Sequence, residues 1–197
     1  ISDRCDGFIV DALPHDSNYF TNQMQSVKNY YNVVSNGNVD FEIHVIDEVY
    51  TLSNDMEYYA KSDFRLSELF MESIELASDK LNLYFDDNGD IVDSDDVLIV
   101  VFHAGLGQDI SVPFIDPTSY DIKSAYIEPC MYQNTTLNPI ETDIGQIEYG
   151  IVLPETENLI FFDVIEDIFY DYDNYCNYQF GIIGIFAFLL GYHMELP

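Results

Sequence analysis

The sequence predicts an α/β (α+β) fold in which helices cover a sheet, over a single domain of 197 residues. Patterns typical of strands alternate along the chain with patterns typical of helices, and this order favours layers of helix packed on sheet. Hydrophobic residues make up 48% of the chain and aromatic residues 15%, which is enough apolar surface for one large core. No internal repeat or low-complexity linker divides the chain. We therefore expect one domain over residues 1–197.

Four segments are predicted to be strands. Residues 7–13 form a short apolar run that is closed by a proline, which is typical of a buried strand. Residues 39–52 begin with strict alternation of apolar and polar side chains, which predicts a half-buried strand or hairpin arm. The continuous apolar run at 97–107 predicts a central strand covered on both faces. Residues 149–154 predict a further strand.

Helices are predicted between these strands. Residues 21–35 have helical spacing and stop at an Asn-Gly turn signal. Residues 62–81 start with Ser-Asp, a favourable helix beginning, and carry an apolar face. Residues 155–172 are also predicted to be helical, whereas 108–148, with four prolines, are predicted to be rich in loops.

The chain ends in a strongly apolar stretch, GIIGIFAFLLGYHMELP, residues 181–197. The uninterrupted apolar run from Ile182 to Leu190 is far shorter than the roughly 20 residues that a membrane-crossing helix needs. The sequence therefore predicts no membrane insertion. A helix that is apolar on all sides is typical of the middle of a domain, so we expect a buried C-terminal helix.

The charge balance is extreme, with 36 acidic residues against 6 lysines and arginines and a formal net charge of -30. Such a charge repels phosphate groups, which argues against nucleic acids and anionic membranes as partners. It is consistent with cation binding, but we favour solvation of an extracellular protein. The three cysteines, Cys5, Cys130 and Cys176, lack zinc-site spacing, and the pairing of any disulfide stays open.

An acidic turn at 85–96, FDDNGDIVDSDD, is the best-formed motif. Asp86, Asn88 and Asp90 stand at the first, third and fifth places of a calcium loop, where alternate oxygens converge on a hard cation. The glycine after the fifth place and the closing glutamate of such loops are missing. Further oxygen ligands would come from Asp93, Asp95 or Asp96. A calcium site and a solvated acidic turn both remain open.

Four histidines are scattered along the chain. We expect His15 and His44 at the surface. His103 ends the predicted central strand, where α/β folds place ligand sites, although a histidine bonded to nearby backbone explains it as well. No serine-hydrolase elbow, phosphate-binding loop or dinucleotide fingerprint is present, which argues against those enzyme classes.

Three segments together resemble the M6 family of secreted metallopeptidases, the immune inhibitor A group. Residues 24–60 are similar to its helix, strand and YTLP...YY ending, and 84–109 are similar to its acidic turn, strand and HAG-x-G loop. Residues 181–197 are similar to its GV-x-x-HEFGH-x-LGLP helix. The resemblance implies a metzincin- or zincin-like single domain with a mixed twisted sheet and packing helices. Since the family continues beyond its Leu-Pro, it leaves open that the chain is a fragment.

The tail departs from the family at the residues that matter for catalysis. By this resemblance, the two zinc-ligand histidines fall at Gly184 and Phe188, and the catalytic glutamate falls at Ile185. Zinc-dependent hydrolysis needs two imidazoles one helical turn apart and a carboxylate beside them, and these three residues offer no ligand atom and no base. We expect the lost metal site to be filled by packing, with Phe188 taking its volume and Ile185 buried.

These observations lead to one leading hypothesis and two alternatives. The leading hypothesis is a secreted, catalytically inactive M6-like domain that acts by binding a protein partner or by self-assembly, with calcium as a structural cofactor and no zinc. One alternative is a structural subunit of an extracellular filament or surface layer. The other is an atypical zinc metallopeptidase whose metal is held by His103, His193 and Glu195.

Overall fold

The computed structural model describes residues 14–81, 97–109, 120–128, 130–133, 140–142, 145–147, 149–162 and 175–196. The described helices are α1 (Ser17–Val34), α2 (Met56–Ala60), α3 (Asp63–Leu76), α4 (Ser78–Leu81), α5 (Cys130–Gln133) and α6 (Ile183–His193). The described strands are β1 (Ile99–Gly107), β2 (Ala125–Ile127), β3 (Ile140–Thr142), β4 (Gly145–Ile147), β5 (Gly150–Phe162) and β6 (Tyr175–Phe180).

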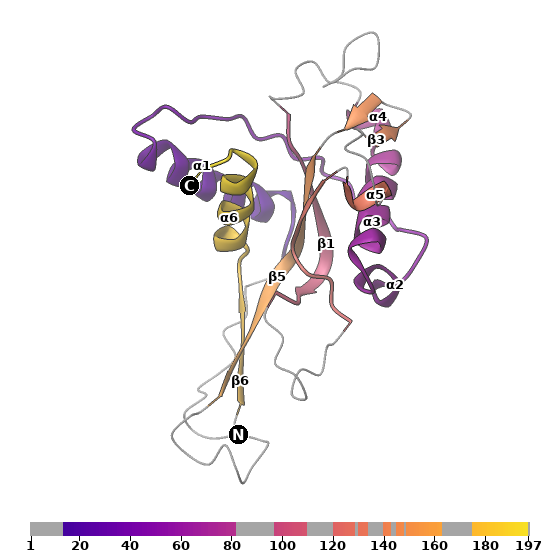
Figure 1. Ribbon diagram of the computed structural model, residues 1–197. Coiled ribbons are helices and arrows are strands. Elements are labelled where there is room, and N and C mark those ends of the chain that lie inside the picture. The colour runs from indigo at the N-terminus through magenta and orange to yellow at the C-terminus, as the bar shows by residue number, and fades with distance from the viewer. Residues whose placement is uncertain are drawn as a thin grey trace.

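A mixed sheet built around β5 forms the centre of the structure, which confirms the α/β class. β5 pairs in parallel with β1 and antiparallel with both β2 and β6, and β3 and β4 form a separate hairpin. Figure 1 shows α1 and α6 on one side of the sheet and α3 on the other, and β5 and β6 extend together away from the helices. The described residues thus form three layers, helix, sheet and helix.

Each face of the sheet has its own apolar core. On the α1/α6 side the core includes Met24, Val27, Ile151, Leu153, Ile182, Phe186 and Leu190. On the α3 side it includes Leu66, Leu69, Phe70, Ile74, Ile127 and Val152. The side chains of β5 alternate between the two cores, as the two-residue period of a strand requires.

The helices predicted at 21–35 and 62–81 are confirmed, although α1 begins at Ser17, before its predicted start. The carboxylate of Asp16 accepts the first free N–H groups of α1, and the hydroxyl of Ser62 accepts the N–H of Arg65 in α3. After α1 the chain turns through Asn36 (φ 55°) and Gly37 (φ 79°), a left-handed backbone that favours these residues. The predicted helix at 62–81 is interrupted once, between α3 and α4.

Helices α1 and α6 pack closely on the same side of the sheet. The hydroxyl of Tyr31 donates a hydrogen bond to the main-chain oxygen of Ala187 at 2.5 Å. A Cβ added to Gly191 would lie 2.5 Å from the same hydroxyl, so only glycine permits this approach. None of the described helices is both long and apolar enough to cross a membrane, and α6 itself has 11 residues.

The structure corrects the role predicted for β1. Its strand is present, but it is an edge strand, because from Ile99 to Leu106 no described strand pairs with its other edge. Its first four residues are half-buried, whereas Ile151, Val152 and Leu153 of β5 are fully buried. β5, which begins in the predicted strand at 149–154, is the central strand. A continuous apolar run therefore did not distinguish the centre of the sheet from its edge.

Two further predictions of secondary structure are wrong. Residues 155–162 were expected to be helical but continue β5, because pairing with β6 outweighs a local helical pattern. Residues 39–52 contain no strand, although Val39, Phe41, Ile43 and Val45 pack against the α1/α6 core. Alternation in that segment reports burial on one side, not pairing with a neighbouring strand. The predicted strand at 7–13 and residues 163–172 lie outside the described residues.

Candidate functional site

Two of the three tail positions identified by the family resemblance, Gly184 and Phe188, lie on the solvent-exposed side of α6. Gly184, Phe188 and Tyr192 follow one another at intervals of four residues and form one exposed stripe along the helix. Phe188 is 68% exposed, and no atom lies within 4 Å of a Cβ added to Gly184. Ile185 is half-buried and contacts the α1/α6 core.

The expectation that packing fills these positions is therefore wrong for Gly184 and Phe188. The expectation of a helix buried in the middle of the domain is also wrong, because only one face of α6, with Phe186 and Leu190, is covered by α1 and the sheet. An apolar composition on all sides does not specify which face of a helix has a neighbour. The stripe is apolar and open, and it carries no metal-binding side chain.

The three residues of the alternative metal site have separate surroundings. His103 is buried in the middle of β1, where its two ring nitrogens lie 3.0 and 3.2 Å from main-chain carbonyl oxygens, and burial lowers its pKa. His193 Nδ1 lies 2.8 Å from the hydroxyl of Tyr126, and Glu195 is exposed. In the part of the chain that the structure describes, no group of three or more His, Cys, Asp or Glu could hold a metal ion.

Other predicted site residues cannot be placed. The calcium-loop residues Asp86, Asn88, Asp90, Asp93, Asp95 and Asp96 lie outside the described residues, as does Cys5. Cys130 is a free, exposed thiol, and the backbone of Cys176 lies opposite Phe161 in the pairing of β5 with β6. The calcium site stays a prediction.

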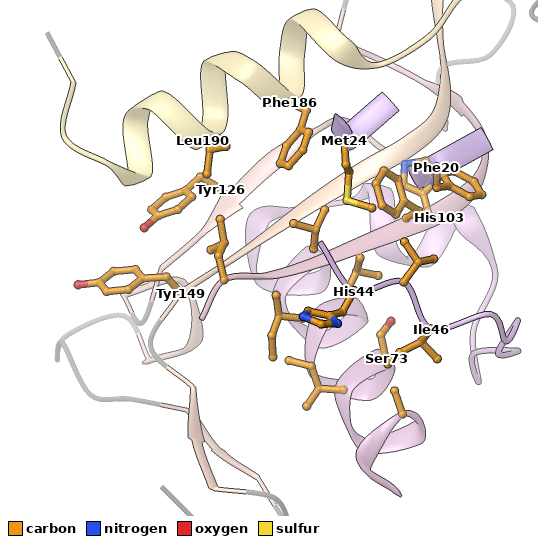
Figure 2. A pocket seen from close by; sticks show the side chains of 18 of the residues that line it. Phe20, Met24, His44, Ile46, Ser73, His103, Tyr126, Tyr149, Phe186 and Leu190 are labelled. Atoms are coloured by element: carbon orange, nitrogen blue, oxygen red, sulfur yellow. The ribbon is translucent and has the colours of Figure 1, made fainter. Parts of the chain in front are cut away.

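A groove of about 2070 Å³ runs along β1 (Figure 2). β1 contributes its floor over residues 99–104, and the two helix layers contribute opposite sides. Figure 2 shows Met24, Phe186 and Leu190 on the α1/α6 side, with Ile46 and Ser73 on the α3 side. The segment 39–52 supplies the remaining wall. Because residues of both cores line it, the groove occupies the place where the next strand beside β1 would lie.

The groove is lined by acidic groups and histidines. Its lining includes Asp40, Glu42, Glu48, Glu128, Glu155 and Glu195. All four histidines of the chain also line it, whereas no lysine or arginine does among the described residues. The predicted surface position of His44 is confirmed, since its side chain is 56% exposed. Lys28 and Lys80, which lie outside the lining, pair with Asp40 and Glu48, and the remaining carboxylates leave the groove with a negative charge.

At the end of the groove near the carboxyl end of β1, His15 pairs with Glu155. The Nδ1 atom of His15 lies 2.5 Å from Glu155 Oε1, and the N–H of Gly105 donates to Glu155 Oε2 at 3.0 Å. The side chain of His15 is only 6% exposed, so its predicted surface position is wrong. Its Nε2 is sealed from solvent and has no described hydrogen-bond partner. The pair therefore anchors the start of α1 to β5 and does not present a base to the groove.

At the opposite end, three tyrosines and a histidine form an aromatic cluster of Tyr126, Tyr149, Tyr192 and His193. The rings of Tyr126 and Tyr149 are stacked with centroids 5.8 Å apart, and Tyr192 meets Tyr126 edge-on at 5.1 Å. The ring of His193 lies 5.8 Å from Tyr126 and 6.0 Å from Tyr149. Figure 2 shows Tyr126 and Tyr149 far along the groove from Phe20 and His103.

The carboxylates of Glu128 and Glu195 lie near this aromatic cluster. The hydroxyl of Tyr192 donates to Glu128 Oε1 at 3.2 Å. Burial raises the pKa of Tyr126, and the neighbouring Tyr149, Glu128, Tyr192 and Glu195 raise it further. The hydroxyl of Tyr126 is therefore neutral at physiological pH, while the negative charge of this end of the groove resides on the two carboxylates.

The pairing of β1 with β5 shifts register between His103 and Leu106. Beyond this irregularity, Glu157 of β5 approaches Asp109. The hydroxyl of Ser124 donates to Glu157 Oε1 at 3.2 Å, and the N–H of Ser124 donates to Asp109 Oδ1 at 2.8 Å. Burial, together with the hydrogen bond and charge of Asp109, raises the pKa of Glu157 to about 9. Glu157 is therefore protonated at neutral pH and makes a hydrogen bond with Asp109 in that form.

We expect Glu157→Gln to stabilise the fold increasingly as pH rises. The unfolded glutamate ionises near its usual value of 4.5, whereas the folded one keeps its proton up to about 9, so the wild type loses stability across that window. Glutamine keeps a donor to Asp109 and has no proton to lose. The gain should reach about 1–3 kcal/mol near pH 8.5 and vanish near pH 4. It stays in this range because solvent screens the partly exposed side chain.

Urea unfolding across this pH range measures the effect. Glu75→Gln, at an exposed position on α3, is the matched control and should show no such trend. A gain for Glu157→Gln that is equal at all pH values would contradict a proton held by Glu157.

Comparison with family models found no match, and comparisons with curated proteins and with solved structures found none either. The M6 resemblance thus rests on the motifs of the chain itself.

Sequence reasoning missed the aromatic cluster and the Glu157 pair. Tyr126 and Tyr192 are distant in sequence and belong to no motif, so only the fold brings them together. For Glu157 a signal existed, because a charged residue at the start of the apolar stretch NLIFF becomes unusual once that stretch is assigned to a strand.

Proposed function

We propose that the chain is a non-catalytic, M6-like extracellular domain that binds an extended, basic polypeptide segment in the groove along β1. The free edge of β1, facing this groove between two helix layers, is the observation that carries the proposal. An unpaired strand edge offers a row of N–H and C=O groups to another strand.

The lack of catalysis follows from the residues of α6. Gly184, Ile185 and Phe188 provide neither two imidazoles nor a carboxylate base at the positions that the resemblance assigns to them. The extracellular setting and a structural calcium ion at 85–96 belong to the same proposal, supported by the acidic turn and the M6 resemblance.

The length and shape of the groove favour an extended ligand. Residues 99–104 of β1 line it, a span of about 20 Å, which matches a strand of about six residues. Alternate side chains of β1 face the two layers, with Val100 and Phe102 in contact with the α1/α6 core and Ile99 and Val101 in contact with the α3 core. A bound strand would likewise divide its side chains between the two layers.

Charge determines which polypeptide fits. The groove is lined by six carboxylates, and the whole chain carries a formal charge of -30. A basic segment gains from this field in both association rate and specificity, whereas an acidic segment is repelled.

Hydrogen exchange with a defined peptide tests the proposal. The probe is acetyl-Lys-Val-Lys-Val-Lys-Val-Lys-amide, and its control has the same sequence and charge with every backbone nitrogen methylated, so that it cannot donate hydrogen bonds. We expect the probe to slow exchange of those amides in residues 99–104 that point away from β5, because the others already pair with β5, and the control to leave them unchanged.

Two results would contradict the proposal. Slow exchange of all these amides without peptide would show that 39–52 itself pairs with β1 and fills the groove. Stoichiometric zinc binding together with zinc-dependent cleavage of an unfolded substrate would show that the domain is a metallopeptidase.

A further inference from the structure

We infer that the aromatic cluster, with Glu128 and Glu195, is a binding site for a cationic side chain, the ammonium of lysine or the guanidinium of arginine. The inference rests on the proposed function for its partner, because the cation would belong to the segment bound along β1. It adds a specificity site at one end of the groove.

The aromatic cluster presents ring surface to solvent in a way that a packed core does not. Tyr192 is 56% exposed and Tyr149 is 37% exposed, while Tyr126 and His193 lie beside them and are only half-exposed. The ring contacts described above fix the orientations of these side chains, so an incoming group meets a preformed surface. The face of a tyrosine ring carries negative quadrupole potential and attracts cations.

The charges around the aromatic cluster have the sign that a cation requires. Glu128 is held by the hydroxyl of Tyr192, and both Glu128 and Glu195 line the same end of the groove. A carboxylate beside an aromatic face adds a direct ion pair to the attraction of the rings.

The described part of the chain supplies no lysine or arginine to this site. Each lysine and arginine in it forms an ion pair elsewhere: Lys28 with Asp40, Lys61 with Glu57, Arg65 with Glu68, Lys80 with Glu48, and Lys123 with Asp63. Neither Glu128 nor Glu195 takes part in any of these pairs. The complementary charge is therefore expected to come from a ligand.

Matched peptides test the site within the groove. The parent probe is acetyl-Nle-Val-Thr-Val-Thr-Val-Nle-amide, and two derivatives replace the first or the last norleucine with lysine, which has a similar stem and adds the ammonium. We expect one of the two derivatives to bind about 5- to 20-fold more tightly than the parent, and the end that matters gives the direction of the bound strand.

Single substitutions identify the side chains that produce the tighter binding of the lysine peptide. Tyr149→Leu and Glu128→Gln should each reduce the preference for lysine over norleucine, measured as the ratio of the two affinities, by at least about 3-fold. Tyr30→Leu, at an exposed tyrosine of α1 outside the groove, should keep the full preference. Equal binding of all three peptides, or a preference that survives both variants, would overturn the inference while the groove itself stands.

A small cation tests the site even if no peptide binds. Titration with tetramethylammonium, followed by the NMR signals of the tyrosine rings, should shift Tyr149 and Tyr192, and neopentyl alcohol, a neutral molecule of the same shape, should not. Shifts without peptide binding would support the cation site and refute the proposed groove function. Absence of shifts, or equal shifts with both compounds, would refute the cation site.

Discussion

Replacing Phe70 with alanine is expected to lower the free energy of unfolding by about 3–5 kcal/mol. Phe70 lies on α3 with no exposed surface, and its ring is packed directly against the backbone of Gly150 in β5. Truncation removes the contact that holds α3 to the central strand and leaves a cavity that neighbouring helices and strands cannot close. Phe64→Ala, at a half-exposed position on the same helix, is the control and should cost less than about 1 kcal/mol.

The partner of Phe70 gives a second measurement of the same contact. A Cβ added to Gly150 would overlap the phenyl ring, so Gly150→Ala should cost about 1–3 kcal/mol by overpacking. Combining it with Phe70→Leu should cost less than the two single changes together, because the smaller side chain makes room for the new methyl group. Urea unfolding of all variants measures the coupling, and strict additivity would contradict this contact.

Phe186 and Phe188 should respond very differently to alanine, although they are two residues apart on α6. Phe186 is 3% exposed within the α1/α6 core, so Phe186→Ala should cost about 3–5 kcal/mol. Phe188 is 68% exposed, so Phe188→Ala should change stability by no more than about 0.5 kcal/mol.

The stability changes of Phe186→Ala and Phe188→Ala also test how α6, which resembles the catalytic helix of the M6 family, is packed. Thermal or urea unfolding of the two variants measures the effect, and each serves as the control for the other. Equal losses would mean that Phe188 is packed as a replacement for a metal site, which is the expectation that the structure has already overturned.

The sequence was sufficient to predict the features that depend on local chemistry. Capping residues and a turn signal predicted α1 and α3, and a continuous apolar run predicted β1. The features that depend on distant partners could not be predicted in this way. Whether 155–162 forms a helix or a strand depends on β6, whether β1 lies at the centre or the edge depends on which strands reach it, and the solvent-exposed face of α6 depends on where α1 docks.

In the candidate site, too, the features set by local residues could be predicted and those set by distant partners could not. The absence of ligand atoms at Gly184, Ile185 and Phe188 could be deduced from the residues alone. The groove and the aromatic cluster could not, because they arise from Tyr126, Tyr149 and residues of α6 that the sequence keeps far apart. The burial of His15 likewise depends on Glu155 at the far end of the chain.

The negative charge of the protein also affects how two of its copies approach each other. An open strand edge is the feature through which proteins with sheets pair with their own copies and aggregate. A second copy that approached β1 edge to edge would carry the same formal charge of -30, and this repulsion opposes the encounter. The charges that would favour a basic strand would thus also disfavour pairing between two copies of the protein through this edge.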